Sequence, residues 1–157
     1  MLHRHPFLSV VTLAYLAFVG WVTLTPAADA PTSSELVLRA LARLQAQPHL
    51  GWLTYERAEY LANVAMFLPV GLFLLLLFGT RLWWLALVAA LALTSSIETV
   101  QTAIPGRVSD GRDIAANTLG ALVGILVGLV LTFPATVRRW AAEDDARRPA
   151  RAQAGRR

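Results

Sequence analysis

The sequence predicts an all-α integral membrane bundle of four transmembrane helices, and two observations carry that prediction. Of the 157 residues, 56% are hydrophobic and only 15% are charged, whereas a soluble domain carries about 25% charged residues. The apolar residues also gather into long runs, each near the roughly 18 residues that a spanning helix needs. These runs cover residues 7–25, 60–79, 82–102 and 114–133. The composition excludes a disordered chain, a coiled coil and an ordinary water-soluble enzyme.

The first run is expected to remain in the protein as a membrane helix. Residues 3–5 and 28–30 resemble the basic start and the cleavage site of a signal peptide. The apolar core is longer than the roughly 7–15 residues of such a peptide, and Pro31 directly after the cut would hinder cleavage. Retention is therefore the prediction, with cleavage as the alternative.

The loop between the first two runs, residues 26–59, is predicted to hold a short amphipathic helix that lies on the outer leaflet. Ser33 or Ser34 can cap this helix, which extends to about Ala46. Its charged and apolar residues fall on different sides. The charged side carries Glu35, Arg39 and Arg43, and the apolar side carries Val37, Leu41 and Leu44.

The distribution of arginine predicts that both termini lie in the cytoplasm. With the N-terminus inside, the inner segments carry nine arginines and the outer loops carry five, as the positive-inside rule requires. Seven of the nine belong to residues 134–157, a basic cytoplasmic tail that we expect to be weakly ordered and to contact anionic lipid. The net charge of +4 comes from this tail and not from a basic folded face, so no nucleic-acid partner is expected.

Polar residues inside the apolar runs form a candidate site near the outer ends of the helices. Glu98 and Gln101 lie three positions apart in the third run, so their side chains share a face. A carboxylate at this depth usually faces the bundle interior, with a partner or a water-filled pocket.

The fourth run begins with Asp113 and Asn117, on a face that continues as glycine. Asp113 is favourable at a helix N-terminus because of the helix dipole. The glycines leave the backbone bare for close helix contact, which turns the polar pair towards the bundle. They are Gly120, Gly124 and Gly128.

The second run brings Asn63 to the same level. Gly71 continues its face, and Pro69 lacks an N–H, which frees the carbonyl of Ala65. We therefore assign Pro69 and Gly71, like the glycines of the fourth run, to helix packing.

The loop between the third and fourth runs contains two turn dipeptides, at 105–106 and 110–111. Arg107 and Arg112 can fold back over Glu98, and an arginine fork also suits an external carboxylate or phosphate. Two interpretations stay open: an ion pair that locks the loop onto the bundle, or an outward-facing pocket for a polar headgroup. The candidate ligand-binding cluster is Asn63, Glu98, Gln101, Arg107, Asp110, Asp113 and Asn117.

These residues follow the pattern of a known family. Residues 63–71 resemble the N-x-x-x-F-x-P-x-G segment of the VanZ-like membrane proteins, and residues 98–124 resemble their E-x-x-Q…R-x-x-D-x-x-D-x-x-x-N-x-x-G-x-x-x-G signature. Residues 23–26 resemble the end of the family's first helix. The resemblance implies a small multi-pass protein of the bacterial plasma membrane, with residues 1–133 as its VanZ-like transmembrane domain. The family's namesake is associated with low-level resistance to lipoglycopeptide antibiotics of the teicoplanin type.

Several function classes fit this sequence. We predict a binding protein whose polar pocket contacts a lipid-linked cell-wall precursor or a lipoglycopeptide. An intramembrane enzyme is the alternative, with Glu98 and Asp113 as an acid/base pair and Arg107 stabilising an anion, although the cluster has no histidine. A transporter would need a homo-oligomer, and a structural subunit stays open. The chain has no cysteine and no histidine pair at metal-ligand spacing, so we expect no metal and no cofactor.

Overall fold

The computed structural model describes residues 6–26, 35–104 and 110–154, with side chains from 39 onwards in the second range and up to 134 in the third. Helices make up these ranges apart from their short connections. Four of the described helical segments are long and apolar enough to cross a membrane. The predicted all-α bundle of four spans is confirmed.

The helices begin and end close to the predicted runs, with two differences. They are α1 (Pro6–Leu24), α2 (Glu35–Gln45), α3 (Tyr55–Phe78), the 3₁₀ turn η3 (Thr80–Leu82), α4 (Trp83–Gln101) and α5 (Gly111–Ala154). Helix α3 begins earlier than predicted because Thr54 caps it, its hydroxyl accepting the N–H of Arg57 at 3.3 Å.

Helix α5 continues through the predicted tail. It is helical as far as Ala154. Alanine and arginine dominate this segment, and both are good helix formers. The segment also extends a helix that already exists, so it avoids the unfavourable nucleation step.

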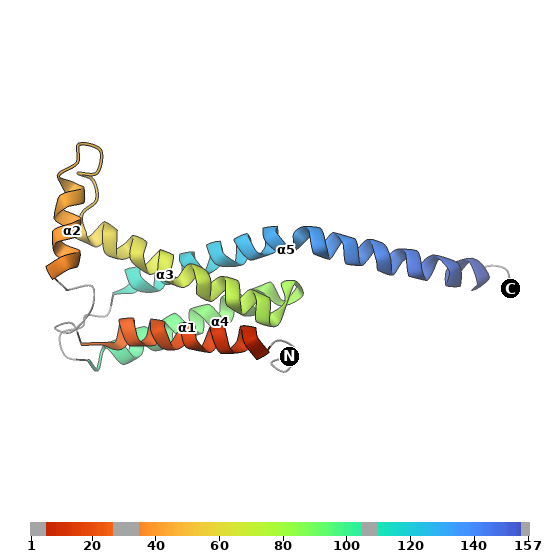
Figure 1. Ribbon diagram of the computed structural model, residues 1–157. Coiled ribbons are helices and arrows are strands. Elements are labelled where there is room, and N and C mark those ends of the chain that lie inside the picture. The colour runs from red at the N-terminus through yellow and green to blue at the C-terminus, as the bar shows by residue number, and fades with distance from the viewer. Residues whose placement is uncertain (1–5, 27–34, 105–109, 155–157) are drawn as a thin grey trace.

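The four spans run beside one another, and α2 crosses one end of the bundle (Figure 1). At this end, called here the α2 end, α1 and α4 finish while α3 and α5 begin. The start of α1 and the extension of α5 lie at the opposite end. The α2 end therefore collects the polar residues that the sequence places at the outer ends of the spans.

Helices α3 and α5 touch backbone to backbone. A Cβ atom added to Gly120 would overlap the carbonyl oxygen of Val64, and one added to Gly124 would overlap that of Leu68. Gly71 on α3 is pressed against the backbone of α5 in the same way. Only glycine permits this separation, so these residues allow the two helices to approach closely.

Two further residues assigned to packing lie on the same pair of helices. Gly128 faces two leucine side chains of α3 rather than its backbone. Pro69 lies inside α3, and the Tyr15 hydroxyl donates to the carbonyl of Met66 nearby, at 2.8 Å. That bond ties α1 to the stretch of α3 that the proline leaves short of one internal hydrogen bond.

The core lies between the four spans, and large apolar side chains also cover the outside of the bundle. The fully buried members include Val19, Phe67, Val70, Leu75, Ala86, Ala90, Ala121 and Ile125. Phe7, Val88 and Leu131 are more than half exposed. An outer surface of this kind is stable against hydrocarbon and costly against water, so the bundle contacts the lipid bilayer.

Replacing Gly124 by alanine is expected to destabilise the folded bundle. Overpacking a core lowers the free energy of unfolding by about 1–3 kcal/mol. Because the added Cβ here clashes with rigid backbone, the loss of stability should lie at the upper end of this range or beyond it. The measurement is the melting temperature of the protein in detergent. Gly20→Ala is the matched control, because nothing lies within 4 Å of the added Cβ. Equal melting temperatures for the two variants would contradict the close α3–α5 contact.

Candidate functional site

Asn63 and Asp113 meet at the α2 end and join α3 to α5. The Asn63 Nδ2 donates to Asp113 Oδ1 at 2.9 Å. Asp113 stands in the first turn of α5, where the helix dipole favours a negative charge. Asp110 caps the same turn, since its Oδ1 accepts the N–H of Arg112 at 2.9 Å.

Glu98 is buried, with 6% of its surface exposed. Its Oε1 accepts the backbone N–H of Asp110, so α4 holds the residue at which α5 begins. Arg107, the predicted ion-pair partner, lies outside the described residues. Arg112 does not fold over Glu98: it reaches Glu56 on α3 at 3.8 Å, where both side chains are largely exposed.

Gln101 and Asn117 are also buried, and each joins two helices. The Gln101 Nε2 donates to the carbonyl of Thr23, the end of α1, at 2.8 Å. The Asn117 Nδ2 donates to the hydroxyl of Thr94 on α4 at 2.9 Å. The Asn117 Oδ1 is buried and has no hydrogen-bond partner among the described residues.

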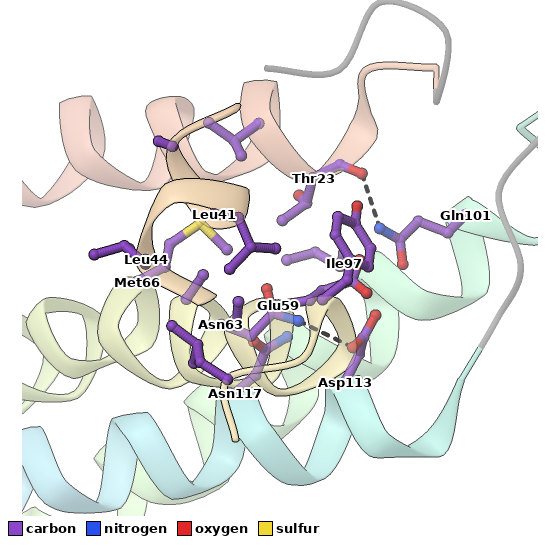
Figure 2. A pocket seen from close by; sticks show the side chains of 16 residues that line it. Thr23, Leu41, Leu44, Glu59, Asn63, Met66, Ile97, Gln101, Asp113 and Asn117 are labelled. Carbon is purple, nitrogen blue, oxygen red and sulfur yellow. Dashed lines mark hydrogen bonds between the residues drawn. The ribbon is translucent and has the colours of Figure 1, made fainter. Parts of the chain in front are cut away.

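A cavity of about 320 Å³ lies beside these groups, between α2 and the ends of the spans. Figure 2 shows Leu41 and Leu44 of α2 on one side and the Asn63–Asp113 pair on another. We call it the α2 cavity. Its apolar walls are Val22, Ala40, Leu41, Leu44, Leu53, Tyr55, Ala58, Ala62, Met66 and Ile97, and its polar groups are Thr23, Glu59, Asn63, Gln101, Asp113 and Asn117.

A second depression of about 630 Å³ lies next to the α2 cavity. We call it the surface hollow. It is lined by Trp52, Glu56, Arg57, Glu59, Tyr60, Leu61, Asp110, Arg112 and Asp113. Glu59 and Asp113 line both depressions. Their carboxylates therefore stand at the boundary between an apolar space and a polar one.

The structure divides the predicted cluster into two groups. Four members line the α2 cavity, namely Asn63, Gln101, Asp113 and Asn117. Glu98 and Asp110 instead hold the start of α5 through their mutual bond. The described members of the cluster make hydrogen bonds between helices. A network with a purely structural role would make the same bonds.

Sequence reasoning missed Glu59, Thr94 and the inward side of α2. Glu59 lies four residues before Asn63, and Thr94 lies four before Glu98. That spacing places each residue on a helix face that already carries a predicted site residue, and it is the signal in the sequence that could have revealed them. Leu41 was assigned to the apolar face that meets the leaflet, and it also lines the α2 cavity. No spacing within α2 indicates this, because its apolar face suits a bilayer and a cavity equally well.

The described groups suit binding better than metal chemistry. No group of three His, Cys, Asp or Glu in the described ranges can hold a metal ion. The cavity lining given above holds carboxylates, amides, the hydroxyls of Thr23 and Tyr55, and apolar side chains, with no arginine or histidine. Apolar walls with a few polar groups on one side are typical of small-molecule sites.

Four spanning helices, joined at one end by buried polar contacts, make this chain a multi-pass integral membrane protein. A family model described as VanZ/LLP1 matches residues 12–132, from α1 to near the end of the last span. The chain belongs to this family, and the resemblance seen in the sequence is confirmed. A search of the curated proteins and a search of the solved structures each gave no match.

Glu98→Ala is expected to destabilise the α2 end. Removing a buried, charged acceptor from the Asp110 N–H should cost about 1.5–3 kcal/mol, read as a loss of melting temperature and membrane abundance. Glu98→Gln keeps an acceptor and should recover part of the loss. Glu56→Ala removes an exposed ion pair and should cost no more than about 1 kcal/mol. If Glu56→Ala proves as harmful as Glu98→Ala, the assigned role of Glu98 is wrong.

Proposed function

We propose that this VanZ/LLP1 protein binds an amphiphile in the α2 cavity, and thereby modifies susceptibility to lipoglycopeptide antibiotics of the teicoplanin type. The ligand is the drug itself or a lipid-linked cell-wall precursor. One observation carries the proposal: the α2 cavity, at the ends of the membrane spans, has mostly apolar walls and carries carboxylates where it borders the surface hollow.

The two depressions match the two parts of an amphiphile. An acyl tail would lie against Leu41, Met66 and Ile97, gaining about 25 cal/mol for each Å² of apolar surface that it buries. The polar head would lie at Glu59 and Asp113 and extend into the surface hollow. A volume of about 320 Å³ accommodates part of a tail, at the small end of the roughly 300–1,000 Å³ of ligand pockets.

The proposed site faces outwards, at the bacterial plasma membrane. The arginine distribution favours both termini in the cytoplasm, and α1 begins at the end opposite α2 (Figure 1). Exposed aromatic side chains lie at both ends of the bundle, as they do in interfacial belts. They are Trp21, Trp52 and Tyr55 at the α2 end, and Trp83 and Trp84 at the other. A drug arriving from outside would then meet the α2 cavity directly.

Cysteine labelling tests the orientation. The chain has no cysteine, so single substitutions report cleanly. Gln47→Cys, in the connection after α2, should react with an impermeant thiol reagent on intact cells. Arg81→Cys, between α3 and α4, should react only after lysis. Both positions are exposed, so access depends on the side of the membrane. The reverse pattern would place the α2 cavity in the cytoplasm and end the proposal.

Ala62→Phe tests the binding function. Ala62 lines the α2 cavity, and a phenyl ring there would fill part of it. We expect the purified variant to bind teicoplanin or a lipid-linked precursor about tenfold more weakly, which is ~1.4 kcal/mol. Cells carrying it should also lose the change in susceptibility.

Ala65→Phe is the matched control for this test. Ala65 is an exposed alanine on the same helix and is not part of the cavity lining. It should leave binding and susceptibility unchanged at equal membrane abundance. Wild-type protein that binds neither compound, or Ala62→Phe protein that binds both as well as wild type, would refute the proposed function.

A further inference from the structure

The polar side of the α2 cavity offers hydrogen-bond acceptors. The amide groups of Asn63, Gln101 and Asn117 each use one of their two N–H donors on a protein oxygen, at 2.9, 2.8 and 2.9 Å. The Asn117 Oδ1 is buried at the lining with no partner in the described part of the chain. Asn117 itself is only 4% exposed. An unpaired buried acceptor of this kind costs free energy until a donor reaches it.

Among the described residues, negative charge exceeds positive charge at the boundary with the surface hollow. Glu59, Asp110 and Asp113 line the same hollow, and the Glu98 Oε1 accepts the N–H of Asp110. The hollow is lined by four carboxylates and two guanidinium groups.

Each guanidinium group of the hollow has a protein partner. Arg112 pairs with Glu56 at 3.8 Å, and the Arg57 Nη1 donates to the carbonyl of Trp52 at 2.7 Å. Neither lines the α2 cavity. Carboxylates at the edge of a membrane span are costly without a counter-charge, so a cationic head would be stabilised here and an anionic head repelled.

We propose that the α2 cavity selects amphiphiles whose polar head is a protonated primary amine, with the ammonium group held at Asp113 and Glu59. The inference rests on the proposed function and names the class of its ligand. An ammonium group has three donors and no acceptor, which complements two carboxylates and the free Asn117 Oδ1. The apolar walls take the attached hydrocarbon chain. A phosphate head would bring negative charge against the carboxylates of Glu59 and Asp113, which repel it.

A fluorescent reporter in the cavity tests this selectivity. Leu44→Cys on α2 lines the cavity and is 44% exposed, so it can carry an environment-sensitive dye on the otherwise cysteine-free chain. The full chain is placed in phosphatidylcholine nanodiscs and titrated with dodecylamine and with dodecyl phosphate. The two probes share a tail and differ in the charge of the head. We expect the affinity for dodecylamine to exceed the affinity for dodecyl phosphate by about tenfold or more.

Variants assign the preference to the boundary carboxylates. Asp113→Asn should bring the ratio of the two affinities towards one, whereas Asp113→Glu should keep it. Glu59→Gln is the second neutralising variant, since Glu59 is exposed and its loss should leave folding intact. Glu56→Gln is the matched control: it removes a carboxylate from the same hollow but not from the cavity lining. Ala62→Phe should weaken the binding of both probes.

Two results overturn the inference. One is equal or tighter binding of dodecyl phosphate. The other is an amine preference that Glu59→Gln and Asp113→Asn leave unchanged. If teicoplanin still changes the fluorescence of the reporter while the two probes bind with equal affinity, the proposed function survives and only the amine selectivity fails. If neither probe nor drug nor precursor binds, both fail.

The same assay identifies the source of the amine. Phosphatidylethanolamine in the nanodisc presents a primary amine from the membrane itself. Weaker apparent binding of dodecylamine in such discs would assign the site to an amine-headed membrane lipid. Unchanged binding would assign it to an amphiphile that arrives from outside the bilayer. Both results require the amine preference and therefore support it.

Discussion

The backbone contact between α3 and α5 is the constraint on which the rest of this structure depends. Gly120 and Gly124 meet Val64 and Leu68 in the same order along both helices, so the two spans run parallel and in register. That register brings the start of α5 beside Asn63 and makes the 2.9 Å bond to Asp113 possible. In lipid there is no hydrophobic driving force between helices, so close packing by small residues has to supply the association. The candidate site is therefore a consequence of glycines that lie deeper in the membrane.

Polar contacts extend this pair into a four-helix bundle. Gln101 ties α4 to the end of α1, Asn117 ties α5 to α4, and Glu98 holds the residue before α5. Each such bond contributes about 1 kcal/mol in a membrane, so their number matters more than any single one. The amide hydrogens used in these bonds are not offered to a ligand. The network that stabilises the α2 end thus takes up part of the donor capacity of these amides, and it leaves the Asn117 Oδ1 without a partner among the described residues.

Helix α2 completes the site from outside the bundle. Its Leu41 and Leu44 close the apolar side of the cavity, and Gln45 donates to the carbonyl of Leu53 at 2.7 Å, which folds the connection to α3 back on itself. The cavity therefore has one wall on a short helix outside the bundle, while its polar groups belong to the spans themselves.

The sequence alone determined the four spans, the short helix after the first, and the polar face of α4. Each of these depends on length, composition or periodicity within one segment, and the bilayer acts on each segment separately. The sequence did not predict that α5 extends to Ala154, because the charged, proline-containing segment was considered separately from the helix that precedes it. Only the tertiary structure decided that Asn63 meets Asp113, that Gln101 meets Thr23, and that Leu41 faces a cavity. Those partners lie 50 and 78 residues apart, and their meeting depends on the rotation and depth of whole helices, which spacing along one helix does not specify.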